Sequence, residues 1–310
     1  MAAISQAVRC AVDTHPEIQG RHFQDISFKS IRVGIAGYDR PALAPLINKA
    51  LRELFSRSLS GGNLTVTSDI DLLTAGVENK KNIENVIILN AGTGSIAMSY
   101  KRGESGGRLR RTGRVGGWGY LLGDDGAGYG IAREAIRRAL RYHEMRQLLG
   151  SATSDHKRAA RLYQAVIEHF QSRSSGPPSS KSTGDLLGSI LAEEFRASPA
   201  NHVASVAPVI LGLAHDDAEC QSIIDMAIAS LLEIVEVLVK SQSMDLTNTA
   251  LVLGGGLMRD DSYRGRILDA IEAKLGRVAH IEVITEPATT VVQHLLLTLP
   301  HSTREIRGLI

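Results

Sequence analysis

The sequence predicts an α/β fold. Short, β-branched apolar segments alternate along the chain with longer segments whose apolar residues recur at helical spacing. Glycine-rich stretches stand where apolar strands end, and this alternation is typical of a layered α/β protein. At 310 residues the chain is long enough for two compact domains, each with its own buried core.

The first part of the chain predicts two strands and two helices. Residues 1–20 form an amphipathic pattern, and the strand Ile31–Ala36 ends in a glycine turn. Residues 41–59 again carry apolar side chains at helical spacing. A β-branched strand over Leu64–Asp69 follows, and we expect it to end on the aspartate.

The next part predicts a β-hairpin that leads toward a long helix. Two apolar runs in residues 85–100 are joined by a small, glycine-containing turn. A glycine-dense stretch over residues 114–130 then opens onto the amphipathic pattern of residues 131–149, which predicts a helix.

The last part predicts helices and two further strands. Residues 171–184 are rich in Ser, Pro and Gly and predict a loop or a mobile insertion. Helices dominate residues 185–241, and a buried strand then ends in Gly254–Gly256. A short strand over Ile281–Ile284 and a closing helix complete the pattern.

Composition and charge exclude several classes of protein. The net charge of +2 gives no reason to expect nucleic acid or a membrane surface as a partner, and no apolar run approaches the length of a membrane span. Cys10 and Cys220 are too few for a disulfide framework, and the ten histidines show no metal spacing. We therefore expect a cytoplasmic protein with no metal site of its own.

Two segments could handle a phosphate group and a proton. In the turn Gly92-Thr93-Gly94 the glycines would let backbone N–H groups converge on an anion, although a tight hairpin turn that needs positive φ has the same composition. Asp69 could accept a proton from an attacking hydroxyl, or it could simply cap a helix. Asp71 is the weaker candidate for this role.

Two other glycine clusters could approach a ligand. Gly117, Trp118 and Gly119 lie close to the pair Asp124 and Asp125, so that an aromatic wall and carboxylates could face a sugar. The alternatives are a structural turn with an aspartate cap, or a weak metal site. The glycines that end the late strand, among them Gly254 and Gly255, could receive a nucleotide or form an ordinary strand-to-helix turn.

The order of these pieces resembles the BadF/BadG/BcrA/BcrD ATPase family, and in particular its N-acetylglucosamine kinase type. The resemblance runs from about Ser30 to Leu299, and its most specific part is LNAGTGSIA followed by GGWGYLLGDDGAGYGIAREA. It implies an actin-like ATPase fold with two ribonuclease H-like lobes. Residues 1–89 would form a partial first lobe, residues 90–299 the second lobe, and residues 300–310 a tail.

The resemblance also implies an activity, which is ATP-dependent phosphorylation of an amino sugar with Mg²⁺, most simply N-acetyl-D-glucosamine at its 6-hydroxyl. Asp69 matches the catalytic aspartate of the family. Three groups of residues match its binding segments. The phosphate loop corresponds to Gly92, Thr93 and Gly94, the adenosine loop to Gly254 and Gly255, and the sugar site to Asp69, Ser95, Ile96, Gly117, Trp118, Gly119 and Asp124. A homodimer is an assembly that the resemblance allows.

The sequence departs from the family pattern in two places. No Asp-Gly-Gly-Gly-Thr loop precedes Asp69, so we expect an incomplete first lobe with an open sheet edge and impaired catalysis. The last helix, in ATTVVQHLLL, lacks the usual Gly-Ala pair. The alternative is an inactive relative that senses a sugar or nucleotide. The iron–sulfur branch of the family is rejected, because no cysteine lies between Cys10 and Cys220.

Overall fold

The computed structural model describes residues 2–38, 42–59, 63–149, 154–173, 188, 190 and 198–298. The chain divides into two compact units, the first comprising Met1–Lys80 with Glu286–Ile310 and the second comprising Lys81–Thr285. The predicted boundary at residues 89 and 90 differs from this division, because it would cut through a strand that pairs along its whole length in the second unit. The closing helix belongs to the first unit.

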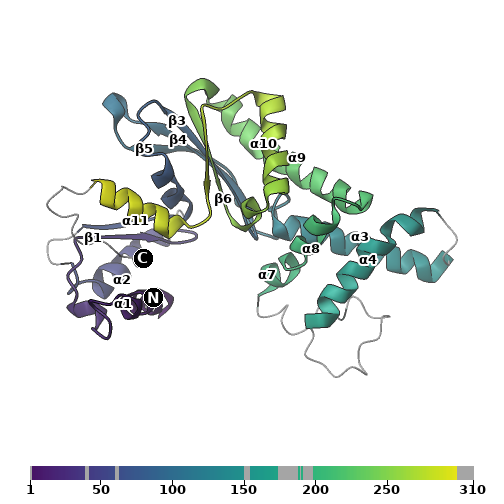
Figure 1. Ribbon diagram of the computed structural model, residues 1–310, viewed down its shortest axis with the longest axis horizontal. Coiled ribbons are helices and arrows are strands. Elements are labelled where there is room, and N and C mark those ends of the chain that lie inside the picture. Colours follow the sequence, from purple (N-terminus) through teal and green to yellow (C-terminus); the bar gives the residue numbers. More distant parts are fainter. Residues whose placement is uncertain are drawn as a thin grey trace. The chain divides into compact units, whose positions relative to one another are not determined.

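The first unit contains a two-stranded parallel sheet with helices on both faces. Strands β1 (Ser30–Gly34) and β2 (Asn63–Thr67) pair with Ile31 opposite Leu64 and Val33 opposite Val66. Helices α1 (Ala2–Thr14) and α2 (Ala44–Leu54) lie on one side of the sheet and α11 (Pro287–Thr298) on the other (Figure 1). Two 3₁₀ turns complete the unit, namely η1 (Phe23–Asp25) and η2 (Ile70–Gly76).

The second unit is built on a five-stranded mixed sheet in the order β5-β4-β3-β6-β7. The strands are β3 (Asn85–Ala91), β4 (Ser95–Arg102), β5 (Leu109–Gly116), β6 (Thr249–Gly254) and β7 (His280–Ile284). Strands β3 and β4 form the predicted antiparallel hairpin, with Ala91 opposite Ser95. Strand β6 then pairs in parallel with β3 on one side and β7 on the other. A strand from late in the chain therefore lies beside the hairpin.

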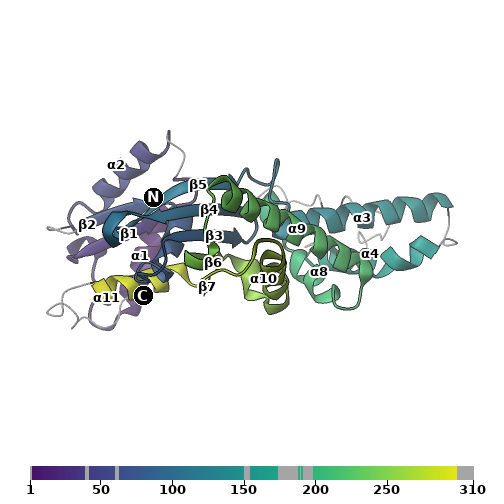
Figure 2. The same cartoon turned by 90° about the horizontal axis from the view of Figure 1, so that it is seen from above.

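Helices cover the sheet of the second unit and extend away from it (Figure 2). They are α3 (Gly128–Leu149), α4 (Ser154–Arg173), α7 (Pro199–Ala204), α8 (Ala207–Leu213), α9 (Ala218–Ser241) and α10 (Asp261–Leu275). Short 3₁₀ turns lie at η3 (Glu104–Gly106), η5 (Leu246–Asn248) and η6 (Gly256–Arg259). Helix α9 packs against β3, β4 and β5, and α10 packs against α9.

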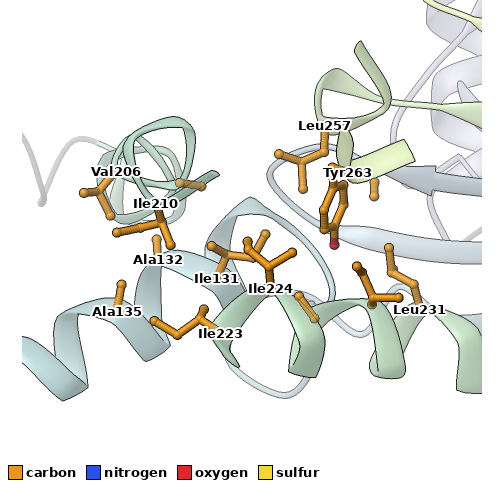
Figure 3. Close-up of a cluster of buried hydrophobic side chains, with 14 of the residues drawn as sticks. Ile131, Ala132, Ala135, Val206, Ile210, Ile223, Ile224, Leu231, Leu257 and Tyr263 are labelled. Atoms are coloured by element: carbon orange, nitrogen blue, oxygen red, sulfur yellow. The ribbon is translucent and has the colours of Figure 1, made fainter. Parts of the chain in front are cut away.

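The core of the second unit joins one face of the sheet to these helices. Ile87 and Leu89 of β3 are buried with Leu231 of α9 and Ile131 of α3. Figure 3 shows how Ile131, Ile224 and Tyr263 converge from three different elements. Each fully buried aliphatic side chain of this kind contributes roughly 1.5–3 kcal/mol. The β3–β4 turn and the start of α3 are thereby fixed by elements that pack into the hydrophobic core.

Two predicted segments fall partly or wholly outside the described residues. Of the predicted loop 171–184, residues 171–173 are the last residues of α4, and the others are not described. The predicted tail 300–310 also lies outside the described residues. Within the part of the chain that is described, no helix is long and apolar enough to cross a membrane.

Candidate active site

The β3–β4 turn is fixed through its carbonyl groups by the start of α3. The N–H of Gly128 donates to the Gly92 carbonyl at 2.9 Å, and the N–H of Tyr129 donates to the Thr93 carbonyl at 3.0 Å. In a trans peptide the C=O and the next N–H point in opposite directions. The N–H groups of Thr93 and Gly94 therefore point away from α3, side by side, as two donors that an anion could accept.

Both glycines of this turn have close neighbours, but only at Gly94 would a Cβ be crowded. Neither Gly92 nor Gly94 has a positive φ, so the alternative of a turn that needs left-handed glycines is wrong. A Cβ on Gly94 would lie 2.8 Å from Oδ2 of Asp124, whereas Gly92 faces the backbone of Gly255 and Gly256. The turn is thus a place where three segments meet.

Asp124, which lies in the glycine-dense stretch, forms a hydrogen bond to the residue that follows the turn. Its Oδ1 accepts a hydrogen bond from the Ser95 N–H at 2.9 Å, and its own backbone has a φ of 66°. Partial burial raises the pKa of the Asp124 carboxyl, while the Ser95 bond acts in the opposite direction. The neighbouring Asp125 forms an ion pair with Arg133 of α3. Asp124, which the sequence predicts to bind the sugar, therefore also stabilises the hairpin.

The triple glycine at the end of β6 touches the hairpin strand directly. Gly254 pairs with Asn90 in the sheet, and Gly255 has a φ of 94°. A Cβ on Gly255 would lie 2.5 Å from the carbonyl carbon of Ala91. Glycine is required here both by conformation and by contact. The predicted phosphate turn and the predicted adenosine turn are therefore neighbours.

The predicted sugar-binding stretch lies beside Ser95 and Ile96. The N–H of Gly117 donates to the Ser95 carbonyl at 3.0 Å, and a Cβ on Gly117 would lie 2.6 Å from Cδ1 of Ile96. Gly117 and Gly119 have positive φ values of 69° and 86°. Trp118 between them is 69% exposed, so its ring is available to a ligand.

Asn201 is a site residue that the sequence analysis missed. Thr93 Oγ1 donates to Asn201 Oδ1 at 3.1 Å, although the two residues are 108 positions apart. Asn201 lies on the short helix α7, and no motif surrounds it. Only the packing of α7 against α3 brings it to the turn.

Asp69 belongs to the first unit, so it is described apart from the other site residues. Strand β2 ends at Thr67, two residues earlier than predicted, because Asp69 already has helical dihedral angles as the residue that immediately precedes η2. Its exposed side chain makes no capping bond to η2, and Oδ1 accepts from Ser68 Oγ at 3.3 Å. Asp71 instead accepts from the Ser68 N–H at 3.2 Å.

Comparison with known proteins gives two relatives that are both named as N-acetylglucosamine kinases. The chain is 36% identical over 117 residues to an N-acetylmuramic acid/N-acetylglucosamine kinase of Clostridium acetobutylicum, a match that spans 38% of this chain and 34% of that protein. It is 32% identical over 173 residues to an N-acetyl-D-glucosamine kinase of Dictyostelium discoideum, spanning 55% of this chain and 47% of that protein. The chain thus covers about a third to a half of these relatives' length, and no family model matches it.

Solved structures show the fold. A candidate N-acetylglucosamine kinase from Porphyromonas gingivalis superposes with a TM-score of 0.60 at 21% identity, covering 94% of this chain and 84% of that one. A ROK hexokinase from Thermus thermophilus gives 0.50 at 14% identity, covering 96% and 86%. The predicted actin-like ATPase fold is confirmed.

Proposed function

We propose that this chain, which belongs to the N-acetylglucosamine kinase family, binds ATP at the β3–β4 turn and takes part in phosphorylation of an amino sugar. The observation that carries the proposal is the pair of N–H groups at Thr93 and Gly94, which point away from α3 because their peptide partners are already bonded to it. Adjacent backbone donors of this kind suit a phosphate group.

The triple-glycine side of the site would receive the nucleoside. A hollow of about 220 Å³ lies between α8, α9 and α10, and Asp260, Ser262 and Arg266 contribute polar groups to its lining. Asp260 directly follows η6, the turn that begins at Gly256. A nucleotide whose phosphates lie at Thr93 would direct its base toward this side of the unit.

The sugar would lie on the other side of the hairpin turn. Exposed Trp118 offers a flat apolar surface, and the Asp124 carboxylate could accept from a sugar hydroxyl through the oxygen that does not hold Ser95. Asp69 is the proposed base that takes the proton of the 6-hydroxyl as it attacks the γ-phosphate. Its exposed carboxylate is free of any capping bond to η2 and so remains available to a substrate.

Mg²⁺ would have to arrive with the nucleotide. Among the described residues no three His, Cys, Asp or Glu side chains gather at one place. Asp124 and Asp125 are engaged by Ser95 and Arg133 respectively. These residues do not form a metal cage, and we assign no step of the reaction to a protein-bound ion. Mg²⁺ in kinases commonly keeps several waters and is held largely by substrate phosphates.

The test separates binding from turnover. Calorimetric titration with ADP and with N-acetyl-D-glucosamine measures each affinity, and a coupled assay measures sugar-dependent ADP release. We expect ADP to bind the wild type. It should bind Thr93→Val about 2–12-fold more weakly, because the variant loses the hydrogen bond between the Thr93 hydroxyl and Asn201, and a lost hydrogen bond costs about 0.5–1.5 kcal/mol. Absence of ADP binding to the wild type would refute the proposal.

The alternative function is that of an inactive sugar- or nucleotide-binding relative. It is favoured by the lack of an Asp-Gly-Gly-Gly-Thr motif anywhere in the 310 residues. Binding of both ligands without ADP release would support it. Turnover that is abolished by Asp69→Asn and retained by Asp71→Asn would instead support catalysis with Asp69 as the base.

A further inference from the structure

Helix α7 brings Asn201 to the β3–β4 turn, although the helix is too short to hold that position by itself. It has six residues, and Ser198 before it makes no side-chain cap. Isolated helices shorter than about 12–15 residues are marginal in water, so α7 depends on its neighbours. Its Asn201 accepts from the Thr93 hydroxyl at 3.1 Å, and a Cβ on Gly128 would lie 3.6 Å from the Cβ of Ala204. The helix therefore contacts both the turn and the residue that anchors the turn to α3.

Two histidines connect α7 to the helices around it. His202 of α7 has its Nε2 3.0 Å from the Ile190 carbonyl oxygen, and its ring centroid lies 5.1 Å from that of Phe170 on α4. His169 of α4 has its Nε2 2.8 Å from the Oγ of Ser205, the residue directly after α7. Phe170 is buried in the core of the second unit. These contacts tie α7 and the residue that follows it to α4.

The hydrogen-bond partners assign a proton to one nitrogen of each ring. A carbonyl oxygen only accepts, so Nε2 of His202 donates to Ile190. The Ser205 hydroxyl has a single hydrogen, which it donates to the His202 carbonyl at 2.7 Å. The Ser205 oxygen therefore accepts from the Nε2–H of His169. Both bonds form with neutral rings, and a further proton would have to enter at Nδ1.

A positive charge on His169 is unfavourable while α7 is in place. Partial burial, Arg173 one turn further along α4 and His202 of α7 all lower the pKa of the His169 imidazole. Among the described residues no carboxylate forms an ion pair with it. As the pH falls below about 6.5, the ordinary pKa of histidine, protonation favours a state in which the ring reaches water. The position of α7 is therefore most stable above about pH 6.5 and is weakened below it.

We propose that His169 is a positioning residue for nucleotide binding, which holds α7 and thereby Asn201 against Thr93 while its ring is neutral and releases α7 when the ring is protonated. The proposal rests on the proposed function, because it assumes that the β3–β4 turn receives the phosphates. It goes further in assigning a pH dependence of nucleotide affinity to a residue that lies outside the turn.

The test uses the whole chain and three variants. His169→Gln keeps a side-chain N–H that can donate to Ser205 but does not titrate, whereas His169→Ala removes the bond. His143→Gln is the matched control, because His143 of α3 also contacts a hydroxyl of α4, that of Tyr163 at 2.8 Å, but bonds only within the α3–α4 pair.

Two measurements are made at about pH 7.5 and 5.5, one unit on either side of the ordinary histidine pKa. Hydrogen exchange followed by mass spectrometry gives the protection factors of residues 198–206 without nucleotide. The amides that report on α7 are those of His202 and Ser205, which donate to the carbonyls of Ser198 and Asn201. Calorimetry gives the ADP affinity of each variant.

The wild type should lose protection of α7 at least about threefold between the two pH values, and His169→Gln should lose none of it. ADP affinity should fall at least about threefold more in the wild type than in His169→Gln. Titration of the ADP phosphate itself contributes equally to every variant, so this difference isolates His169. His143→Gln should behave as the wild type does, and His169→Ala should show low protection at both pH values.

Equal pH dependence of α7 protection in the wild type and in His169→Gln would overturn the proposal, and so would unchanged protection in His169→Ala. Absence of ADP binding to the wild type would refute the proposed function, while the exchange measurement would still decide whether His169 holds α7. Circular dichroism checks that the variants are folded, and the comparison of the wild type with His169→Gln suffices if His169→Ala is not.

Discussion

Replacing Gly255 by alanine should unfold the second unit at a much lower temperature. Gly255 has a φ of 94° and a ψ of 162°, a region of backbone space that is essentially restricted to glycine. The added Cβ would also press on the backbone of Ala91, whose carbonyl carbon would be 2.5 Å away. The position of the Cβ is fixed by the Gly255 backbone, and the atoms that it meets belong to the Ala91 backbone, so no side chain can rotate to relieve the contact.

The magnitude follows from these two causes. A non-glycine residue in such a conformation costs of order 1–3 kcal/mol. Forcing an extra carbon into a packed site typically costs about 1–3 kcal/mol more. We expect a total of about 3 kcal/mol or more. For a domain of roughly 150–250 residues each kcal/mol lowers the Tm by roughly 2–4 °C, so the expected shift is about 6–12 °C.

Gly256 provides a matched control one residue later. Its φ is not positive and a Cβ on it would meet nothing within 4 Å, so Gly256→Ala should change the Tm by no more than about 2 °C. Differential scanning calorimetry and urea denaturation followed by circular dichroism measure both variants. If Gly255→Ala proved as stable as Gly256→Ala, the contact between the triple glycine and the hairpin strand would be wrong.

Three further predictions concern the same unit. Tyr263→Phe removes a buried hydroxyl that donates to the Gly126 carbonyl at 2.9 Å and should cost about 1–3 kcal/mol in urea denaturation, because that carbonyl loses its partner. Burial lowers the pKa of His169, so the unfolded state binds more protons; stability should therefore fall as the pH drops below about 6.5, and His169→Gln should flatten this slope in pH-dependent melts. Asn201→Ala introduced into the wild-type chain should weaken ADP binding about 2–12-fold, but introduced into the Thr93→Val variant it should have no further effect. A double-mutant cycle measured by calorimetry tests this, and additive losses would refute a role of Asn201 through Thr93.

Local pattern was sufficient for the β3–β4 hairpin and for the general α/β class. Two apolar runs separated by a short glycine-containing turn predict paired strands whatever surrounds them, and β3 pairs with β4 as expected. The end of β2 was predicted less well. The β-branched run through Thr67 favours a strand, but Asp69 already has helical dihedral angles. Chain direction changes at such a point through backbone torsions that composition describes poorly.

Only the tertiary structure decided why the glycines of the candidate site are there. Positive φ was one of two interpretations of Gly94, but the residue has no positive φ and instead makes room for the carboxylate of Asp124, 30 residues further along. Gly255 makes room for Ala91 on a strand from another part of the chain, and Asn201 reaches Thr93 from a helix with no motif at all. Residue type and spacing report local conformation and periodicity. Contacts between distant segments depend on how the sheet and helices pack, so the order of motifs could indicate a family while the contacts among them had to be seen in three dimensions.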